Sequence, residues 1–545
     1  MSQIKINQKA EGFLMFSFLA KKLKFLQLLK KNLSQDQEEQ NKSPQLTANL
    51  KTNLQMIKNI LGNSDDIIIR PFVLGTKDQQ EAALIMIDGL IDKASVHDFI
   101  IKPLMLESRS LNDNDSLADS IEELTETLVC IAEVKKVKTL DELVNDCLKG
   151  DTALLVNGHP GALIINTRGW KSRGIEQPQT EVSVRGPREG FTETLRVNTA
   201  LIRRKIRDPD LTFETMTIGK RSKTDVTIVY LKGVVRPGLV EEIKKRLKKI
   251  NTDLILESGY IEQFIEDAPF SPFSTIGNTE RPDTVAAKIM EGRAAILVDG
   301  TPMVLTVPLL FIESFQTMED YYSRPYYASV VRLLRMLSFF ISIMAPATYV
   351  ALTTFHQELL PTPLALSMAS AREGVPFPAF LEAFLLGLAF EILREAGIRL
   401  PQAVGTAISI VGALVIGEAA VSAGLVSAPL IIVVAITAIS SFAVIPQSDA
   451  SAFIRFTLLL LASTLGIFGI SVGLLGILIH LATLKSFGVP YLAPFAPLKP
   501  ADLKDTLIRF PLWLMITRPS SITKKDPQRE KWGLMPRPQD DNNKG

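Results

Sequence analysis

Three glutamates lie within long apolar segments of the chain, where a charge is costly. They are Glu382, Glu391 and Glu418. A carboxylate near the centre of a bilayer costs roughly 2.5–3.5 kcal/mol on insertion scales, so acids in such segments are functional candidates by default. For Glu418, the chemistry that we expect is the selection of cations by a negative side chain.

Small and polar side chains recur around Glu418 at helical spacing. The residues of this stripe follow one another at spacings of three or four and pass beside Glu418; they are Thr406, Ser409, Ala413, Gly417, Ala420 and Gly424. Small residues let two helices approach closely, and a polar stripe equally lines a water-filled path, so both interpretations stay open. If several copies of this helix surrounded an axis, its hydroxyl groups would hydrate ions and a ring of carboxylates would favour cations.

A loop rich in glycine and arginine lies in the polar half of the chain. Its residues are Arg185, Gly186, Pro187, Arg188, Glu189, Gly190 and Phe191. A helix is predicted to follow from Thr192 to Asp208, with Arg196 and Arg203 on one side. The N–H groups at a helix N-terminus attract anions. We favour the alternative, a basic face that docks on acidic residues of a neighbouring subunit or domain.

The chain carries no recognisable enzyme or metal motif. Cys130 and Cys147 cannot build a disulfide framework, and four scattered histidines lack a zinc-binding spacing. No nucleophile, base and orienting group can be assembled from known motifs, so we predict neither an enzyme nor a cofactor. The 60 basic side chains nearly balance the 58 acidic ones, which argues against a nucleic-acid partner.

Charges are distributed unevenly over the 545 residues. Residues 326–493 hold 14 charged side chains, and the other 377 residues hold 104. This contrast predicts an all-α, multi-pass membrane domain at 326–493 with four to five apolar segments, embedded in lipid. The segments are 336–355, 374–390, 400–425, 428–445 and 456–484.

Five crossings would place the two ends of the chain on opposite sides of the membrane. Arginines before the first segment put the soluble region in the cytoplasm, and the basic, proline-rich tail at 494–545 indicates the same side. Either the segment 374–390 fails to cross, or the glycine-rich segment 456–484 re-enters without crossing. Both possibilities stay open.

The polar half predicts an α/β cytoplasmic region. We expect an amphipathic, basic arm and linker at 1–60, then two small α/β subdomains at 61–137 and 138–325. The arm either lies on the membrane surface or packs on its own domain.

The second subdomain contains an internal repeat. Residues 139–165 align without a gap with residues 281–307, and both copies read helix, glycine, strand, hairpin, strand. Asn157-Gly158 and Asp299-Gly300 occupy the same turn, where both central residues need positive φ. We therefore predict a duplicated helix-strand-hairpin unit.

The strings RGPREGF at 185–191 and FHQELLPTPL at 355–364, with the sequence around them, resemble the A subunit of GerA-type spore germination receptors. The resemblance covers roughly residues 65–497. It implies a protein of the bacterial spore inner membrane, partnered by a transporter-like B subunit that senses a nutrient and by a lipoprotein C subunit. It also implies a homo-oligomer, a pentamer, whose membrane helices form a ligand-gated channel that releases monovalent cations. For RGPREGF it implies a structural or subunit-interface role.

Two alternatives remain beside this interpretation. Stage V sporulation AF-type proteins share the architecture and act as accessory membrane proteins of germination. A secondary transporter would instead show inverted repeats within its membrane region. The repeat found here lies in the soluble half, which counts against a transporter.

Overall fold

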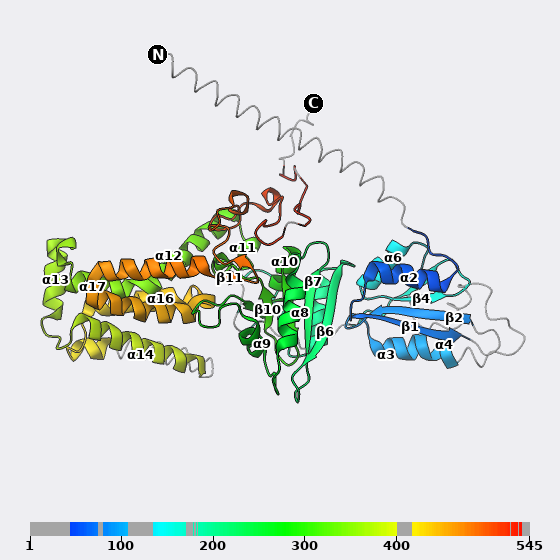
Figure 1. Ribbon diagram of the computed structural model, residues 1–545, viewed down its shortest axis with the longest axis horizontal. Coiled ribbons are helices and arrows are strands. Elements are labelled where there is room, and N and C mark those ends of the chain that lie inside the picture. The colour runs from blue at the N-terminus through cyan, green and yellow to red at the C-terminus, as the bar shows by residue number, and fades with distance from the viewer. Residues whose placement is uncertain are drawn as a thin grey trace, which may run out of the picture. The chain divides into compact units, whose positions relative to one another are not determined.

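The computed structural model describes residues 44–74, 80–106, 134–169, 178, 181, 184–399, 417–523, 525–531 and 533–536. The chain divides into two compact units, Met1–Trp170 with Arg207–Pro209, and Lys171–Ile206 with Asp210–Gly545 (Figure 1). Residues 1–43 of the predicted arm and linker lie outside the described residues. The predicted boundary at residue 60 is wrong, because a helix of the first unit, buried on one face, spans Leu50–Leu61.

The first unit is built on a five-stranded antiparallel sheet in the order β1-β2-β4-β5-β3. Its central strands are buried on both faces, because α2 and α6 cover one face and α3 and α4 the other (Figure 1). The elements are α2 (Leu50–Leu61), β1 (Ile67–Leu74), β2 (Gln80–Ile87), α3 (Lys93–Val96), α4 (Lys102–Leu106), β3 (Val134–Val137), α6 (Leu140–Leu148), β4 (Thr152–Val156) and β5 (Ala162–Ile165).

This sheet crosses the predicted boundary between 137 and 138. β2 pairs with β4, and β3 pairs with β5. The predicted division into 61–137 and 138–325 is therefore wrong, because strand pairing places residues 138–169 in the first unit. Each copy of the repeat completes a sheet of its own.

The second unit begins with a sheet of the same topology, in the order β6-β7-β9-β10-β8. Helices again cover both faces, and they bury separate apolar cores on the two sides of the sheet. The elements are α7 (Leu195–Lys205), β6 (Leu211–Ile218), β7 (Thr224–Leu231), α8 (Leu239–Lys249), α9 (Ser258–Ile265), β8 (Gly277–Thr279), α10 (Pro282–Met290), β9 (Ala294–Val298) and β10 (Val304–Val307).

The duplication is more extensive than the repeat seen in the sequence. Asn53 accepts a hydrogen bond from the Thr47 N–H at 2.9 Å and donates to the Thr47 carbonyl at 2.6 Å. Asn198 makes the same two bonds with Thr192, at 2.8 and 2.6 Å. Both asparagines are 1 % exposed. The same buried amide therefore fastens the segment ahead of α2 and of α7, so the repeat includes these helices.

A helical bundle follows the second sheet. Among the described residues, α12 and α17 are long and apolar enough to cross a membrane, and α16 is a shorter apolar helix. The prediction of four to five apolar segments is thus supported in part. The helices are α12 (Pro325–Thr354), α13 (Thr362–Arg372), α14 (Ala379–Arg399), α16 (Ala428–Phe442) and α17 (Ser448–Thr483).

The helix α17 is folded back on itself at Gly466. This residue has φ 61° and ψ −139°, outside the helical region. A methyl group on Gly473 would lie 2.5 Å from a side-chain carbon of Leu458. In a straight helix their separation of fifteen positions would correspond to about 22 Å. α17 therefore consists of two antiparallel arms that pack closely through glycine.

Both ends of this hairpin return to the second α/β domain. At its start, Gln447 donates to the Ser314 hydroxyl at 2.7 Å. Near its end, His480 forms a hydrogen bond with Ser271 at 2.9 Å. The chain then forms a two-stranded ribbon of β11 (Lys485–Ser486) and β12 (Val489–Pro490). The bundle thus begins and ends at the same domain.

The opposite end of the bundle joins other helices. The Tyr349 hydroxyl, late in α12, lies 3.0 Å from the hydroxyl of Ser427, which caps α16. The Ser427 N–H donates to Glu382, early in α14, at 3.1 Å. The ring of His356 lies against Gly466. α12 therefore runs away from the α/β domain, whereas α14 and α16 run back toward it.

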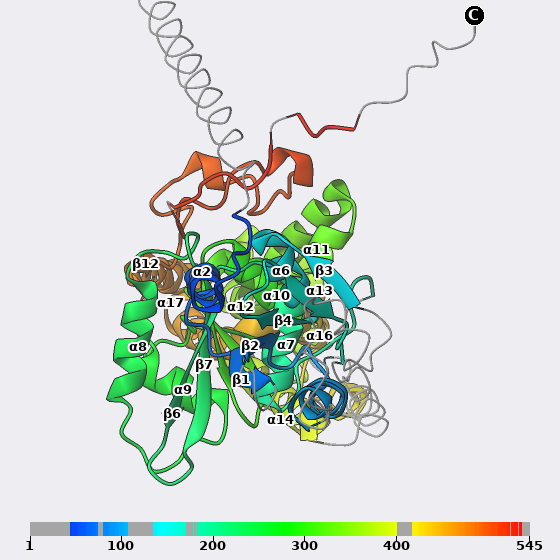
Figure 2. The same cartoon turned by 90° about the vertical axis from the view of Figure 1, so that its right-hand side faces the viewer.

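The C-terminal tail is docked on the α/β domain. Arg236 donates to the Phe487 carbonyl at 2.9 Å, and Thr523 donates to the Val234 carbonyl at 2.7 Å. The tail lies beside α11 (Glu319–Tyr322) in Figure 1, and Figure 2 shows it at one edge of the second unit. The tail and the α/β domain consequently lie at the same end of the bundle.

Replacing the repeated asparagine tests its role. We expect Asn198→Ala to lower the free energy of unfolding by about 2–3 kcal/mol, because the Thr192 backbone N–H and carbonyl lose their hydrogen bonds to the buried side-chain amide. Thermal melts of the detergent-purified chain measure the effect. Asn278→Ala is the control, since Asn278 is an exposed residue of the same sheet. An equal effect of both substitutions would contradict a special role for the buried amide.

Candidate functional site

A fully buried arginine marks the junction between the α/β domain and the helical bundle. Arg332, two turns into α12, is 0 % exposed. Its Nε donates to Asp320 of α11 at 2.9 Å, and its Nη1 donates to Asp505 of the tail at 2.8 Å. A buried guanidinium is tolerated only with good geometry and paired charge. Arg332 thus ties three separate segments together.

Further polar groups surround this pair of acids, and we call the whole set the junction cluster. Arg335 also donates to Asp320, at 2.9 Å. The Tyr321 hydroxyl donates to Asp505 at 2.8 Å. Burial, and then the charge of Asp505, raise the pKa of Tyr321 well above its ordinary value, so the phenol remains a donor. The members are Asp320, Tyr321, Arg332, Arg335, Asp505 and Arg509.

The RGPREGF loop is attached to the junction cluster through the next tyrosine. Gly186 has φ 133°, and a methyl group there would lie 2.6 Å from the ring of Tyr322. The Tyr322 hydroxyl donates to Asp283 at 2.7 Å. Arg281 donates to the same carboxylate at 2.7 Å and to the Pro187 carbonyl at 3.3 Å. The loop is therefore held at a fixed place beside α10 and α11.

The balance of charge around Asp283 keeps it ionised. Burial alone would raise its pKa, but hydrogen bonds from Arg281 and Tyr322 bring the pKa below its ordinary value. An ionised Asp283 can accept from both partners at neutral pH. The contacts of this loop support a structural role.

The basic residues of the loop and its helix are not all available for docking. Arg203 is 1 % exposed, donates to the Leu211 carbonyl at 3.0 Å and lies over the Phe213 ring. Its assignment to an exposed basic face is therefore wrong, because the side chain packs inside the domain. Glu189 is paired with Arg204 at 3.3 Å. The side chains that remain exposed are Arg185, Arg188 and Arg196.

The anion site predicted at the start of this helix is not supported. α7 begins at Leu195, three residues later than expected. The Leu195 N–H already donates to Asp299 at 3.0 Å. A carboxylate of the chain itself therefore occupies the place where an anion would bind.

Two of the three glutamates in apolar segments are paired with arginine. Glu382 is 0 % exposed and lies 3.3 Å from Arg372. Glu391 lies 2.8 Å from Arg394 and 3.1 Å from Arg455, which is itself buried. These pairs explain how the acids are accommodated among apolar helices.

Glu418 differs from the other two acids. Its side chain is exposed, and within the described part of the chain it forms no ion pair. Gly417 is buried and Ala420 is half-buried on the same turn. The rest of the predicted pore stripe, Thr406, Ser409 and Ala413, lies outside the described residues. Of these three glutamates, Glu418 is thus the one whose side chain is exposed and could attract an ion.

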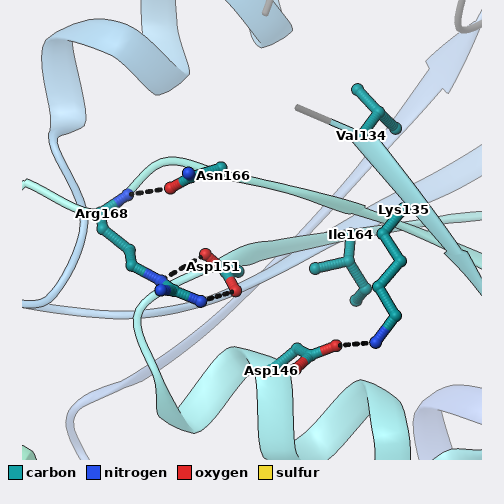
Figure 3. A pocket seen from close by; sticks show the side chains of 7 residues that line it. All are labelled: Val134, Lys135, Asp146, Asp151, Ile164, Asn166 and Arg168. Carbon is teal, nitrogen blue, oxygen red and sulfur yellow. Dashed lines mark hydrogen bonds and ion pairs between the residues drawn. The ribbon is translucent and has the colours of Figure 1, made fainter. Parts of the chain in front are cut away.

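The first unit contains a shallow polar pocket of about 410 Å³ beside β3 and β5 (Figure 3). Arg168 donates to both oxygens of Asp151, at 2.8 and 2.7 Å. Lys135 and Lys149 donate to Asp146 at 2.9 and 2.8 Å. In these ion pairs, the basic and acidic side chains of the pocket bind each other. The described residues contain no metal-binding cluster of His, Cys, Asp and Glu. We assign no ligand to this pocket.

The junction cluster was missed by sequence reasoning. Arg332 and Arg335 were used only to orient the membrane domain, and Asp505 lies 173 residues beyond Arg332. A signal was present in part, since two tyrosines and two acids precede the first apolar segment at 319–322. No local pattern connects them to the tail.

The ion pairs of Asp146 predict a dependence on pH. Burial tends to raise the pKa of Asp146, but hydrogen bonds from Lys149 and Lys135 lower it below the ordinary 3.8. The stabilisation is therefore present above pH 3.8 and is lost as the pH falls through the lower value. We expect Asp146→Asn to cost about 1 kcal/mol at pH 7 and progressively less as the pH falls below 3.8, by thermal melts. A constant cost would contradict the assignment.

Loss of the buried arginine should release the tail. We expect Arg332→Gln to cost about 3–5 kcal/mol, because Asp320 and Asp505 lose their buried partner. Limited trypsin digestion should then cut after Lys504 and Arg509, and mass spectrometry identifies the sites. Arg324→Gln is the control, because Arg324 is exposed. A tail equally protected from trypsin in both variants would contradict the claim that Arg332 holds the tail in place.

Comparisons with known proteins identify relatives of this chain. Residues 55–521 match the model of the Bacillus/Clostridium GerA spore germination protein family. The chain is 45 % identical to spore germination protein KA of Bacillus subtilis over 504 residues, which cover 92 % of each chain. It is 42 % identical to spore germination protein GerLA of Bacillus cereus, over 88 % of this chain and 97 % of that protein.

A solved structure is also similar in sequence. It is the N-terminal domain of the A subunit of the Bacillus megaterium spore germinant receptor GerK3, with 39 % identity and a TM-score of 0.40. The match covers 50 % of this chain and 99 % of that one. On the family match and on relatives that align over most of their length, the chain belongs to the GerA family of spore germination proteins.

Proposed function

We propose that this chain is the A subunit of a nutrient germinant receptor in the spore inner membrane. In this proposal it assembles as a homo-oligomer, a pentamer, whose helices form a ligand-gated channel for monovalent cations. Its partners are a transporter-like B subunit, which binds the nutrient, and a lipoprotein C subunit. Membership of the GerA family and the apolar helical bundle support this assignment.

The observation that carries the channel proposal is the contrast among the three acids. Glu382 and Glu391 are neutralised by arginine, whereas Glu418 is exposed and without an ion-pair partner in the described part of the chain. A carboxylate held near an aqueous path attracts cations and repels anions. A ring of Glu418 side chains, one from each copy, would act as a charge filter.

The direction of the helices supports an even number of membrane crossings. α12 leads away from the α/β domain, and α14 and α16 lead back. The arms of α17, each about 26 Å long, lead away and return. With the segment 400–425 crossing between α14 and α16, the chain crosses six times. In this proposal the tail lies on the same side of the membrane as the second α/β domain, so that the basic tail and the crossings no longer conflict.

An AF-type accessory protein is the alternative within the same architecture. Such a protein would lack its own nutrient-sensing partners. A gene cluster that encodes B-type and C-type subunits beside this one favours the receptor. No observation favours a secondary transporter.

Ion flux from liposomes tests the channel directly. The chain is reconstituted with its B and C partners and exposed to germinant. We expect Glu418→Gln to reduce the permeability ratio of potassium over chloride several-fold, because the filter loses its charge. Glu395→Gln is the control, since this exposed glutamate already pairs with Arg399.

Chemical labelling at Ser409 of the predicted pore stripe provides a second measurement of the flux. A bulky thiol reagent on Ser409→Cys should block the flux if this helix lines the pore. Flux that is unaffected by the label, with unchanged selectivity in Glu418→Gln, would contradict the assignment of the pore to 400–425.

A further inference from the structure

The tail exposes a row of apolar side chains immediately after the junction cluster. The exposed fractions are 55 % for Ile508, 42 % for Phe510, 44 % for Leu512 and 36 % for Leu514. Arg509, between them, and Met515, beyond them, are buried, with exposed fractions of 4 % and 1 %. The segment 508–514, here called the tail strap, therefore has one side fastened to the protein and an apolar side that faces outward.

The tail strap is fixed at the start of α12. The Arg509 N–H donates to the Ser329 hydroxyl at 3.0 Å, and Arg509 Nη1 donates to the Ser323 carbonyl at 3.2 Å. On the helix surface, Ser329 lies between Tyr326 and Leu333, at spacings of three and four residues. Hydrogen bonds thus hold the tail strap beside the first turns of this helix.

The first turns of α12 are themselves apolar on the outside. Tyr326 and Tyr327 are 85 % and 66 % exposed, and Val330, Leu333 and Leu337 follow at 55, 47 and 55 %. Tyrosine at the end of an apolar helix is typical of the interface between lipid and water. The apolar side of the tail strap therefore continues the exposed apolar surface of the first turns of α12, whose composition suits contact with lipid.

The charge of the surrounding segment suits an anionic surface. Residues 485–536 contain nine Lys and Arg and four Asp and Glu, a net charge of +5. Basic residues near a membrane surface are attracted to anionic lipids. Aliphatic and aromatic side chains beside basic ones are the composition of interfacial anchors.

We propose that residues 508–514 form an interfacial membrane anchor that lies in the headgroup region of the anionic lipid leaflet on the side of the α/β domains. Its apolar side chains enter the boundary between headgroups and acyl chains, and Arg509 holds it at the depth of the first turns of α12. The anchor adds a lipid contact at the point where the junction cluster ties the tail to the bundle. It does not depend on whether the chain conducts ions.

The fluorescence of Trp513, near the end of the tail strap and half-buried, tests the anchor. The chain has two other tryptophans, Trp170 and Trp532, which are replaced by phenylalanine. This full-length variant is reconstituted in vesicles of phosphatidylglycerol and phosphatidylcholine brominated either high or low on the acyl chain. We expect stronger quenching by the shallow bromines than by the deep ones, and weak quenching by aqueous acrylamide.

A matched control defines exposure to water. Leu256, 58 % exposed on the α/β domain, is replaced by tryptophan in a background that lacks the other three. Acrylamide quenching of Trp513 as strong as in this control would overturn the proposal, because the tail strap would lie in water. Protection from both acrylamide and brominated lipid would overturn it as well, because Trp513 would then lie against protein and not in the headgroup region.

A second measurement avoids the tryptophan replacements. Leu512→Cys and Leu256→Cys are each made in a Cys130→Ser background. The remaining Cys147 is 0 % exposed and therefore does not react. Both sites lie at the same end of the bundle, so vesicle orientation affects them equally. In anionic vesicles, a charged maleimide should label Leu512→Cys roughly tenfold more slowly than it labels Leu256→Cys. Equal rates would contradict the anchor.

Discussion

The burial of one guanidinium group constrains the second unit of this protein. Arg332 lies where α12 leaves the α/β domain, and its charge cannot be taken from water without compensation. Asp320 supplies one carboxylate from the segment ahead of the helix, and Asp505 supplies the other from the tail. Because Asp505 follows the whole bundle, the pairing requires the chain to come back to its starting point. The docked tail, the proposed even number of crossings and the proposed lipid anchor all depend on this return.

Glycine makes the return possible within the last apolar segment. Gly466 reverses the direction of α17, and Gly473 lets the two arms approach closely. The sequence showed a glycine-rich apolar segment, and it showed a conflict between five crossings and a basic tail. It did not show where the reversal lies, because glycine in apolar helices equally serves close packing between separate helices.

Sequence reasoning succeeded where the signal is periodic and local. The gap-free repeat identified the hairpins at Asn157 and Asp299, and the charge distribution separated the soluble half from the bundle. The expected positive φ at both central residues was wrong, because only Gly158 and Gly300 of these two pairs adopt it. Sequence reasoning also failed where partners are distant. The boundary at 137 was wrong because sheet pairing joins β3 to β5 across α6. Arg203 was placed on an exposed face, although Phe213 and a backbone carbonyl of β6 enclose it.

The distance between the two arms of α17 tests the central claim that the bundle returns to its origin. Spin labels at Phe453 and Ile479, both exposed and equally far from Gly466, are measured by pulsed electron resonance, with an excess of unlabelled chain to suppress signals between copies. A hairpin places the two backbone positions about 10 Å apart, the usual spacing of packed helices, so the account predicts a label distance below roughly 20 Å. A straight helix would separate the positions by about 39 Å, and a distance near that value would contradict the account.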